Sequence, residues 1–340
     1  MVATVLSDFN GQPISMEENR AYLNREQSEC IKGILIILIV LGHNHILCPN
    51  TVSGGLMEYL YTFHVAGFFI LPFFYQSETK TSWTKAGNTI IRCWVPYFWI
   101  CLCCWLSYSI VSHHFEFGFN HIVAFFQGTQ TPIRRSFGFV FPWFLPTYCS
   151  LSIMLLVAKK YQFVFVLQAL LGCATFMMSW MEFYIFKNTV PFGAGLALNY
   201  FASGAITFAI HRYVKYGRYI GAFVFVALSV CWWLKLPLGV LYHFMPATFF
   251  LLLLCIAPLI DHKWLQMLGK HSLGIYLFHV FFINALERLL PPDLWCGWLI
   301  FPISLLIPMM ISYYINQYGT VRSFLFPKSG REFLSFYKRR

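Results

Sequence analysis

Residues 32–43 read KGILIILIVLGH, with ten uncharged residues between Lys32 and His43. In an α-helix eleven steps along the chain make about three turns, so both side chains lie on one stripe, roughly 16 Å apart along the axis. An apolar stretch of this kind is typical of a membrane helix, and an ionisable side chain within a membrane is a candidate for function. The alternative interpretation makes Lys32 an interfacial anchor and His43 a buried core histidine without a chemical role.

The composition of the whole chain also indicates a membrane protein. Of its 340 residues, 58% are hydrophobic and only 11% are charged, and the mean hydropathy is +0.62. Soluble domains carry about 25% charged residues. The net charge of +11 does not indicate a nucleic-acid partner, because basic residues collect in the cytoplasmic loops of membrane proteins. The partner that this composition predicts is the lipid bilayer.

Ten apolar spans are expected, most of them separated by short polar segments. They cover about Ile31–Leu47, Leu56–Tyr75, Thr89–Val111, Gly138–Ala158, Phe163–Phe186, Val190–Ile210, Tyr219–Leu234, Leu238–Ile260, His271–Leu290 and Trp298–Tyr318. The predicted fold class is therefore an all-α, polytopic membrane helix bundle. Residues 1–29 are expected to form a cytoplasmic N-terminal segment, 30–318 a single ten-helix membrane domain, and 319–340 a basic cytoplasmic tail. Because no small-residue cleavage site follows the first span, that span is expected to be retained.

The distribution of basic residues predicts the orientation of the bundle. With the N-terminus in the cytoplasm, 19 of the 24 Lys and Arg residues fall on the cytoplasmic side and 5 outside. This is a strong positive-inside signal, and the even number of spans agrees with two cytoplasmic termini. The longest outer connection, residues 113–137, is predicted to be a solvated or interfacial loop, with part of an acceptor site as the alternative. Its His and Glu residues fit no standard zinc spacing, so no metal is expected.

Three histidines are expected at a similar depth in the membrane. Counting 1.5 Å per residue from the span ends places His43 and His64 roughly 18 Å from the inner face and His279 roughly 12 Å from it. An imidazole facing lipid has no partner, so each of the three is expected to face the bundle interior. Since imidazole titrates near neutral pH, a buried histidine in a cavity suits general-base catalysis.

A cationic cluster is expected at the inner surface. Lys85 and Arg92 are seven residues apart and share one helical face if the third helix begins early enough. Together with Lys32 they would bind phosphate groups from the cytoplasmic side. The alternative is that all three are ordinary positive-inside anchors.

Five motifs together resemble one known family. Lys32-x10-His43 resembles the Arg/Lys-x10-His signature of the acyltransferase 3 family of integral-membrane O-acyltransferases. Four later stretches are similar to the family's FHxPLFF segment (known from fucose 4-O-acetylase-like members), its basic Pro-Tyr entry to the third helix, its WFL segment and its SxxIYLxH segment. In this order they read Phe63-HVAGFF, Arg92-CWV-Pro96-Tyr97, Trp143-Phe144-Leu145 and Ser272-LGIYLF-His279. The resemblance covers roughly residues 25 to 320, and ten spans is also the family's number.

The resemblance implies an activity. Family members transfer an acyl group, usually acetyl from cytoplasmic acetyl-CoA, to a hydroxyl of an extracytoplasmic glycan such as a surface polysaccharide or lipid-linked sugar. By position, His43 would be the catalytic histidine, Lys32 its paired basic residue, and Arg92 a contact to the acyl-CoA co-substrate. A bacterial inner membrane is the location that the resemblance implies.

The remaining candidate residues follow from their positions around these motifs. His279 or His64 would orient His43 or act as a second relay station, and Trp143 and Tyr276 would line a sugar site unless they serve only in packing. Two features depart from the family pattern. Thr89 stands where the family's third-helix Arg-x-x-Arg begins, with Lys85 one turn earlier as a substitute. Leu71-Pro72 replaces the Ser-Gly that commonly follows the FHxPLFF segment.

Two other function classes remain open at this stage. A ten-helix bundle with buried histidines also suits a proton-coupled exporter or glycan flippase, and a non-catalytic subunit of a polysaccharide machine would use the histidines structurally. The transporter class is disfavoured by the lack of a clear internal repeat and by the scarcity of acidic residues in the spans. The main acidic candidates, Glu58 and Glu182, lie near outer ends. The sequence does not decide between direct transfer and an acyl relay through His43.

Overall fold

The computed structural model describes residues 23–49, 51, 53–75, 83–180, 190–239 and 241–338. Within these ranges the chain is helical and contains no β-strand, which confirms the all-helical fold. Among the described residues, six helical segments are long and apolar enough to cross a membrane. They are Leu56–Phe74, Trp83–Ser112, Phe141–Lys160, Pro191–Tyr213, Leu241–Leu259 and Leu294–Gln317. The count of ten spans and the cytoplasmic placement of both termini stay predictions.

Several predicted features lie outside the described residues. They are most of the N-terminal segment (1–22), Lys80, the end of the fifth span with Glu182, Lys187, and the last two residues of the basic tail.

The first helix, α1 (Arg25–His43), begins at a capping box. The Asn24 side chain accepts a hydrogen bond from the Gln27 main-chain N–H (2.8 Å), and the Gln27 side chain accepts one from the Asn24 N–H (3.2 Å). These two bonds satisfy amide groups that the first helical turn leaves without partners. Apolar residues then line the buried side of α1, so the helix lies inside the bundle with His43 as its last residue.

The second predicted span is interrupted. It consists of α2 (Leu56–Tyr61), α3 (His64–Ile70) and the 3-10 turn η2 (Leu71–Phe74). Between the two helices, Phe63 leaves the helical region with φ −139° and ψ −28°. This break turns the chain so that Tyr61 ends one helix and His64 begins the next.

The middle of the chain contains four longer helices and an unexpected pair of short ones. The elements are α4 (Trp83–Ser112), α5 (Phe119–Gln127), α6 (Gln130–Phe137), the 3-10 turn η3 (Phe141–Trp143), α7 (Phe144–Lys160), α8 (Gln162–Trp180), the 3-10 turn η4 (Pro191–Gly193) and α10 (Ala194–Tyr213). The connection 113–137, predicted as a loop, therefore carries α5 and α6. Each ends at a glycine in the left-handed conformation, Gly128 (φ 64°) and Gly138 (φ 76°), where other residues are strained.

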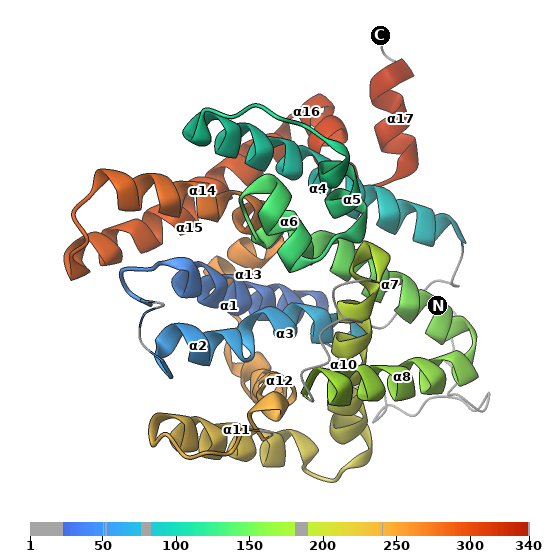
Figure 1. Ribbon diagram of the computed structural model, residues 1–340. Coiled ribbons are helices and arrows are strands. Elements are labelled where there is room, and N and C mark those ends of the chain that lie inside the picture. Colours follow the sequence, from blue (N-terminus) through green and yellow to red (C-terminus); the bar gives the residue numbers. More distant parts are fainter. Residues whose placement is uncertain are drawn as a thin grey trace.

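The last third of the chain returns to the first helix. Its elements are α11 (Gly217–Trp233), the 3-10 turn η5 (Leu241–Phe244), α12 (Met245–Ile256), the 3-10 turn η6 (Ala257–Leu259), α13 (Lys263–Lys270), α14 (Ser272–Leu289) and α15 (Leu294–Gln317). In Figure 1, α1 lies near the middle, with α14 and α15 above it and α11 and α12 below it. It packs against α13, α14 and α3, so helices from both halves of the chain enclose it.

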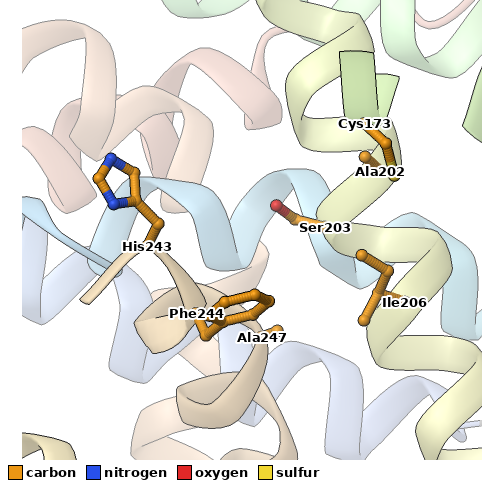
Figure 2. A pocket seen from close by; sticks show the side chains of 7 residues that line it. All are labelled: Cys173, Ala202, Ser203, Ile206, His243, Phe244 and Ala247. Carbon is orange, nitrogen blue, oxygen red and sulfur yellow. The ribbon is translucent and has the colours of Figure 1, made fainter. Parts of the chain in front are cut away.

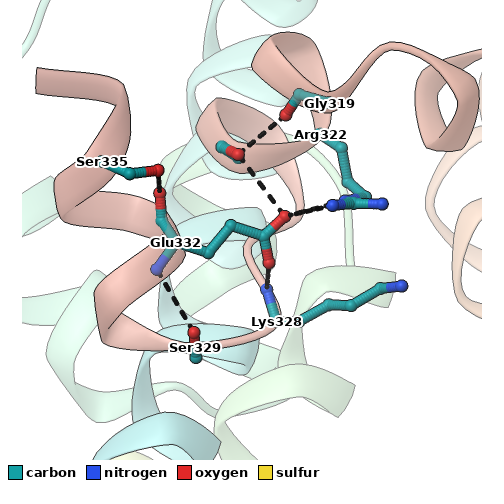
Figure 3. A network of polar contacts seen from close by, with 7 residues as sticks. Gly319, Arg322, Lys328, Ser329, Glu332 and Ser335 are labelled. Carbon is teal, nitrogen blue, oxygen red and sulfur yellow. Dashed lines mark hydrogen bonds and ion pairs between the residues drawn. The ribbon is translucent and has the colours of Figure 1, made fainter. Parts of the chain in front are cut away.

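The predicted basic tail folds into two further helices, α16 (Gly319–Leu325) and α17 (Gly330–Lys338), which pack against α4. Figure 3 shows the Glu332 carboxylate between them, where it accepts hydrogen bonds from the Arg322 guanidinium (2.8 Å) and the Lys328 main-chain N–H (2.9 Å). Burial alone raises the pKa of Glu332, but these hydrogen bonds outweigh it and hold the pKa below its ordinary value. The carboxylate therefore stays ionised and joins α16 to α17.

Candidate active site

The three histidines predicted at one depth come together in the folded chain. His43 at the end of α1 and His279 of α14 are 5.0 Å apart between ring centroids, with perpendicular rings. The Tyr61 ring lies 5.7 Å from His43 and 4.8 Å from His64, so it bridges those two imidazoles. Gly42 lies beside both rings, where a Cβ atom would make ordinary van der Waals contact with Tyr61 (3.6 Å) and with Nε2 of His64 (3.7 Å).

The hydrogen bonds of the three rings assign their tautomers. Nδ1 of His43 is 2.9 Å from the Ile39 carbonyl oxygen, and Nδ1 of His279 is 2.7 Å from the carbonyl oxygen of Tyr276. Nδ1 of His64 likewise bonds the carbonyl oxygen of the residue four positions earlier. A carbonyl oxygen only accepts, so in each neutral ring Nδ1 carries the proton and Nε2 carries a lone pair.

The surroundings of the three Nε2 atoms differ. His64 and His279 are fully buried, and their Nε2 atoms have no hydrogen-bond partner among the described residues. His43 is partly exposed, and its Nε2 lies 3.2 Å from the Tyr61 hydroxyl, which donates to it. His43 is therefore the least buried of the three histidines.

The basic residues predicted at the inner surface gather near the other end of α1. The Lys32 ammonium lies 5.9 Å from the centroid of the Tyr75 ring and interacts electrostatically with Arg92 of α4. Because α4 begins at Trp83, it contains both Lys85 and Arg92. The two residues are seven positions apart and therefore lie on one face of this helix. Lys32 and His43 are eleven steps apart in α1, which corresponds to about 16 Å along the helix axis.

Lys159 belongs to the same cluster and was not among the predicted site residues. Its ammonium donates a hydrogen bond to the Tyr75 carbonyl oxygen (3.2 Å), and it interacts electrostatically with Lys85. The sequence places Lys159 only at the inner end of a span. Nothing in its own segment indicates that α7 brings it beside Tyr75. Lys159 and Lys85 therefore add positive charge near Tyr75.

The two aromatic residues predicted to bind sugar lie inside a packed layer. Trp143 is 6% exposed and stacks on Phe69 at 5.9 Å between centroids. Tyr276 is 5% exposed, and its hydroxyl donates to the Phe141 carbonyl oxygen (2.5 Å). The Tyr276 ring also lies beside the histidines, with 5.8 Å between its centroid and that of His279, and both aromatic side chains are enclosed by the protein. Their predicted role in sugar binding stays a prediction.

The small cavity of Figure 2 lies apart from this site. It measures about 30 Å³ and is lined by Cys173, Ala202, Ser203, Ile206, His243, Phe244 and Ala247. No predicted site residue lines it, and its volume suits a single water molecule. We therefore place the candidate active site at the histidine cluster, with the basic cluster at the other end of α1.

Fold and site together define a class of protein: a membrane protein of packed helices with a cluster of three histidines and a separate cationic cluster. The chain belongs to the acyltransferase 3 family, because the family's model, described as an acyltransferase domain, matches residues 25–317. No curated protein and no solved structure matches the chain. Family membership makes the protein a membrane acyltransferase in general terms and confirms the resemblance found in the motifs.

Proposed function

We propose that the protein transfers an acyl group, in the simplest case acetyl, from cytoplasmic acetyl-CoA to a hydroxyl of a surface or lipid-linked glycan, in the inner membrane of a bacterium. One observation carries this proposal. In a chain of an acyltransferase family, Nε2 of His43 carries a lone pair that accepts a hydrogen bond from a hydroxyl, that of Tyr61 (3.2 Å). A base in contact with a hydroxyl is what O-acyl transfer needs.

The basic cluster is the proposed site for the donor. The phosphate groups of acetyl-CoA are polyanionic, and a bound anion would offset the repulsion between the Lys32 and Arg92 side chains, which interact electrostatically. Lys159 and Lys85 extend the positive surface toward the end of α7. With the phosphates held there, the pantetheine arm would extend along α1 and bring the thioester to His43.

His43 is the proposed general base for direct transfer. Its Nε2 takes the proton of the acceptor hydroxyl as the oxygen attacks the thioester carbonyl carbon. The tetrahedral intermediate then expels the CoA thiolate with cleavage of the C–S bond, and the imidazolium returns the proton to sulfur. The Ile39 carbonyl oxygen stabilises the imidazolium through the Nδ1 proton, which it already accepts.

A relay through the same residue uses the same lone pair. In this route Nε2 attacks the thioester carbon, the CoA thiolate leaves and an acyl-imidazole forms, from which the acceptor oxygen takes the acyl group. Direct transfer requires donor and acceptor to be bound together within about 3–3.5 Å, whereas the relay separates the two steps. His279, whose ring lies against that of His43, would orient that imidazole, and His64 would do so through Tyr61.

Acyl transfer in membranes tests the proposal. Membranes with the wild-type chain should transfer label from radiolabelled acetyl-CoA to the host's surface glycan. His43→Ala should lower the rate about 10²–10⁴-fold, which is the usual contribution of a general base. His114→Ala is the matched control, because His114 is exposed on the outer connection, and it should keep full activity.

Two results would contradict this function. Full activity of His43→Ala, at equal expression and folding, would exclude His43 as the base. Absence of labelling by every variant, combined with loss of glycan export when the protein is deleted, would favour the transporter instead.

A further inference from the structure

The hydroxyl of Tyr61 is hydrogen-bonded to Nε2 of His43, the nitrogen that the acceptor hydroxyl has to contact. It lies 3.2 Å from Nε2 of His43, and in the assigned tautomer that nitrogen has one lone pair in the ring plane. One lone pair accepts one good hydrogen bond. A glycan hydroxyl can therefore reach Nε2 only after the Tyr61 hydroxyl has left it.

Tyr61 is placed where such a displacement requires little rearrangement. It is the last residue of α2, a helix of six residues, and the chain leaves the helical conformation two residues later, at Phe63. Its side chain is 44% exposed, and within the described residues its hydroxyl bonds only to His43. Tyr276 is the contrast, since it is 5% exposed and held by the Phe141 carbonyl oxygen.

We propose that Tyr61 is a specificity-determining residue: its hydroxyl holds the place of the acceptor hydroxyl on His43, excludes water from that nitrogen while no glycan is bound, and yields to the glycan. This inference rests on the proposed function. Water at Nε2 would be deprotonated like an acceptor. Its oxygen would attack the thioester carbon, the C–S bond would break, and acetate and CoA would be released without transfer. An occupied Nε2 suppresses that hydrolysis.

Tyr61→Phe is the informative variant, because it keeps the ring and removes one oxygen atom. The vacated space lies beside Nε2 and within hydrogen-bond distance of it, so a water molecule can take the position. We expect acetate release from radiolabelled acetyl-CoA, without acceptor, to rise at least threefold. With de-O-acylated surface polysaccharide from the host as acceptor, KM should fall at least twofold, while kcat changes by less than twofold.

Matched controls separate this role from others. Tyr59→Phe changes the neighbouring tyrosine of α2, whose hydroxyl donates to Ser229 (2.8 Å) and not to a histidine, and it should leave hydrolysis and KM unchanged. The double variant His43→Ala, Tyr61→Phe should show no gain in hydrolysis, because the base is absent. A Tyr61→Phe chain with lower kcat, unchanged KM and unchanged hydrolysis would overturn the proposal and make Tyr61 a proton donor.

A measurement without any substrate keeps the two proposals apart. Diethyl pyrocarbonate modifies the free lone pair of an imidazole, and peptide mass spectrometry identifies the modified histidine. His43 should be modified at least threefold faster in Tyr61→Phe than in the wild type or in Tyr59→Phe. Equal rates would overturn the role of Tyr61 whatever the enzyme's reaction. Faster modification without any acyl transfer would retain the contact and contradict the acyltransferase function.

Discussion

At the scale of single residues, the two residues after His43 hold the end of α1 in place. The Asn44 side chain is fully buried and donates a hydrogen bond to the Gly297 carbonyl oxygen (2.9 Å) at the start of α15. The Glu287 carboxylate of α14 accepts hydrogen bonds from the His45 main-chain N–H (2.8 Å) and from Nδ1 of its ring (3.0 Å). Because His279 is on the same helix as Glu287, these bonds help to set the His43–His279 distance.

The His45–Glu287 pair makes stability depend on pH. The hydrogen bond to Glu287 raises the pKa of His45, with burial acting in the opposite direction. A raised pKa in the folded state adds stability that is fully present below the unfolded pKa of about 6.5 and is lost as pH rises through the folded pKa. Glu287→Gln should therefore lower the melting temperature more at pH 5.5 than at pH 8.5.

Thermal unfolding in detergent at the two pH values measures this difference. A pair as exposed as this one contributes about 0.2–1 kcal/mol, so the shift at pH 5.5 should be small but resolvable. Glu116→Gln is the control. Its carboxylate lies 3.7 Å from His114, but both side chains are largely exposed, so this substitution should leave the melting temperature unchanged at both pH values. Equal shifts for Glu287→Gln at both pH values would contradict a raised pKa of His45 in the folded protein.

At the scale of elements, the apolar periodicity predicted which segments are helical but not where a helix is interrupted. The spacing from Lys32 to His43 predicted one helix, and α1 contains both residues. The break at Phe63 was missed because neither proline nor glycine lies next to it in the sequence, and the Phe63 ring packs against Phe225 and Phe249 of other helices. The short helices α5 and α6 were missed because their amphipathic patterns are only eight or nine residues long.

A glycine contact between α1 and α13 should be sensitive to a single methyl group. A Cβ atom at Gly269 would lie 1.8 Å from the Glu29 carbonyl oxygen, so Ala requires the two backbones to separate. We expect Gly269→Ala to destabilise the protein by at least about 1–3 kcal/mol, the usual effect of overpacking, and to lower its melting temperature. Gly87→Ala in α4 meets no atom within 4 Å and should not lower it. A Gly269→Ala protein as stable as Gly87→Ala would contradict this close packing.

At the scale of the whole molecule, the candidate site was predicted in part. Depth counting along separate spans placed His43, His64 and His279 at similar levels, and the fold brings them together. Tyr61 and Lys159 were missed, since a tyrosine in an apolar span and a lysine at a span end have no distinctive spacing. Their significance comes from partners far away in the chain, which only the packed bundle reveals.

The orientation of the bundle is the prediction on which the direction of transfer depends. The distribution of Lys and Arg assigns the start of the first span and the end of the second span to the same side of the membrane. In agreement, the Leu23 N–H donates a hydrogen bond to the Phe74 carbonyl oxygen (3.1 Å) near the basic cluster. If that side is cytoplasmic, alkaline phosphatase fused after Lys160 or Lys215 should be inactive, and fused after Phe117 or Lys235 it should be active. Green fluorescent protein at the same four positions is the control and should give the opposite pattern, since it folds in the cytoplasm. The reverse pattern for both reporters would place Lys32 and Arg92 outside, where acetyl-CoA is absent, and would exclude the proposed donor site.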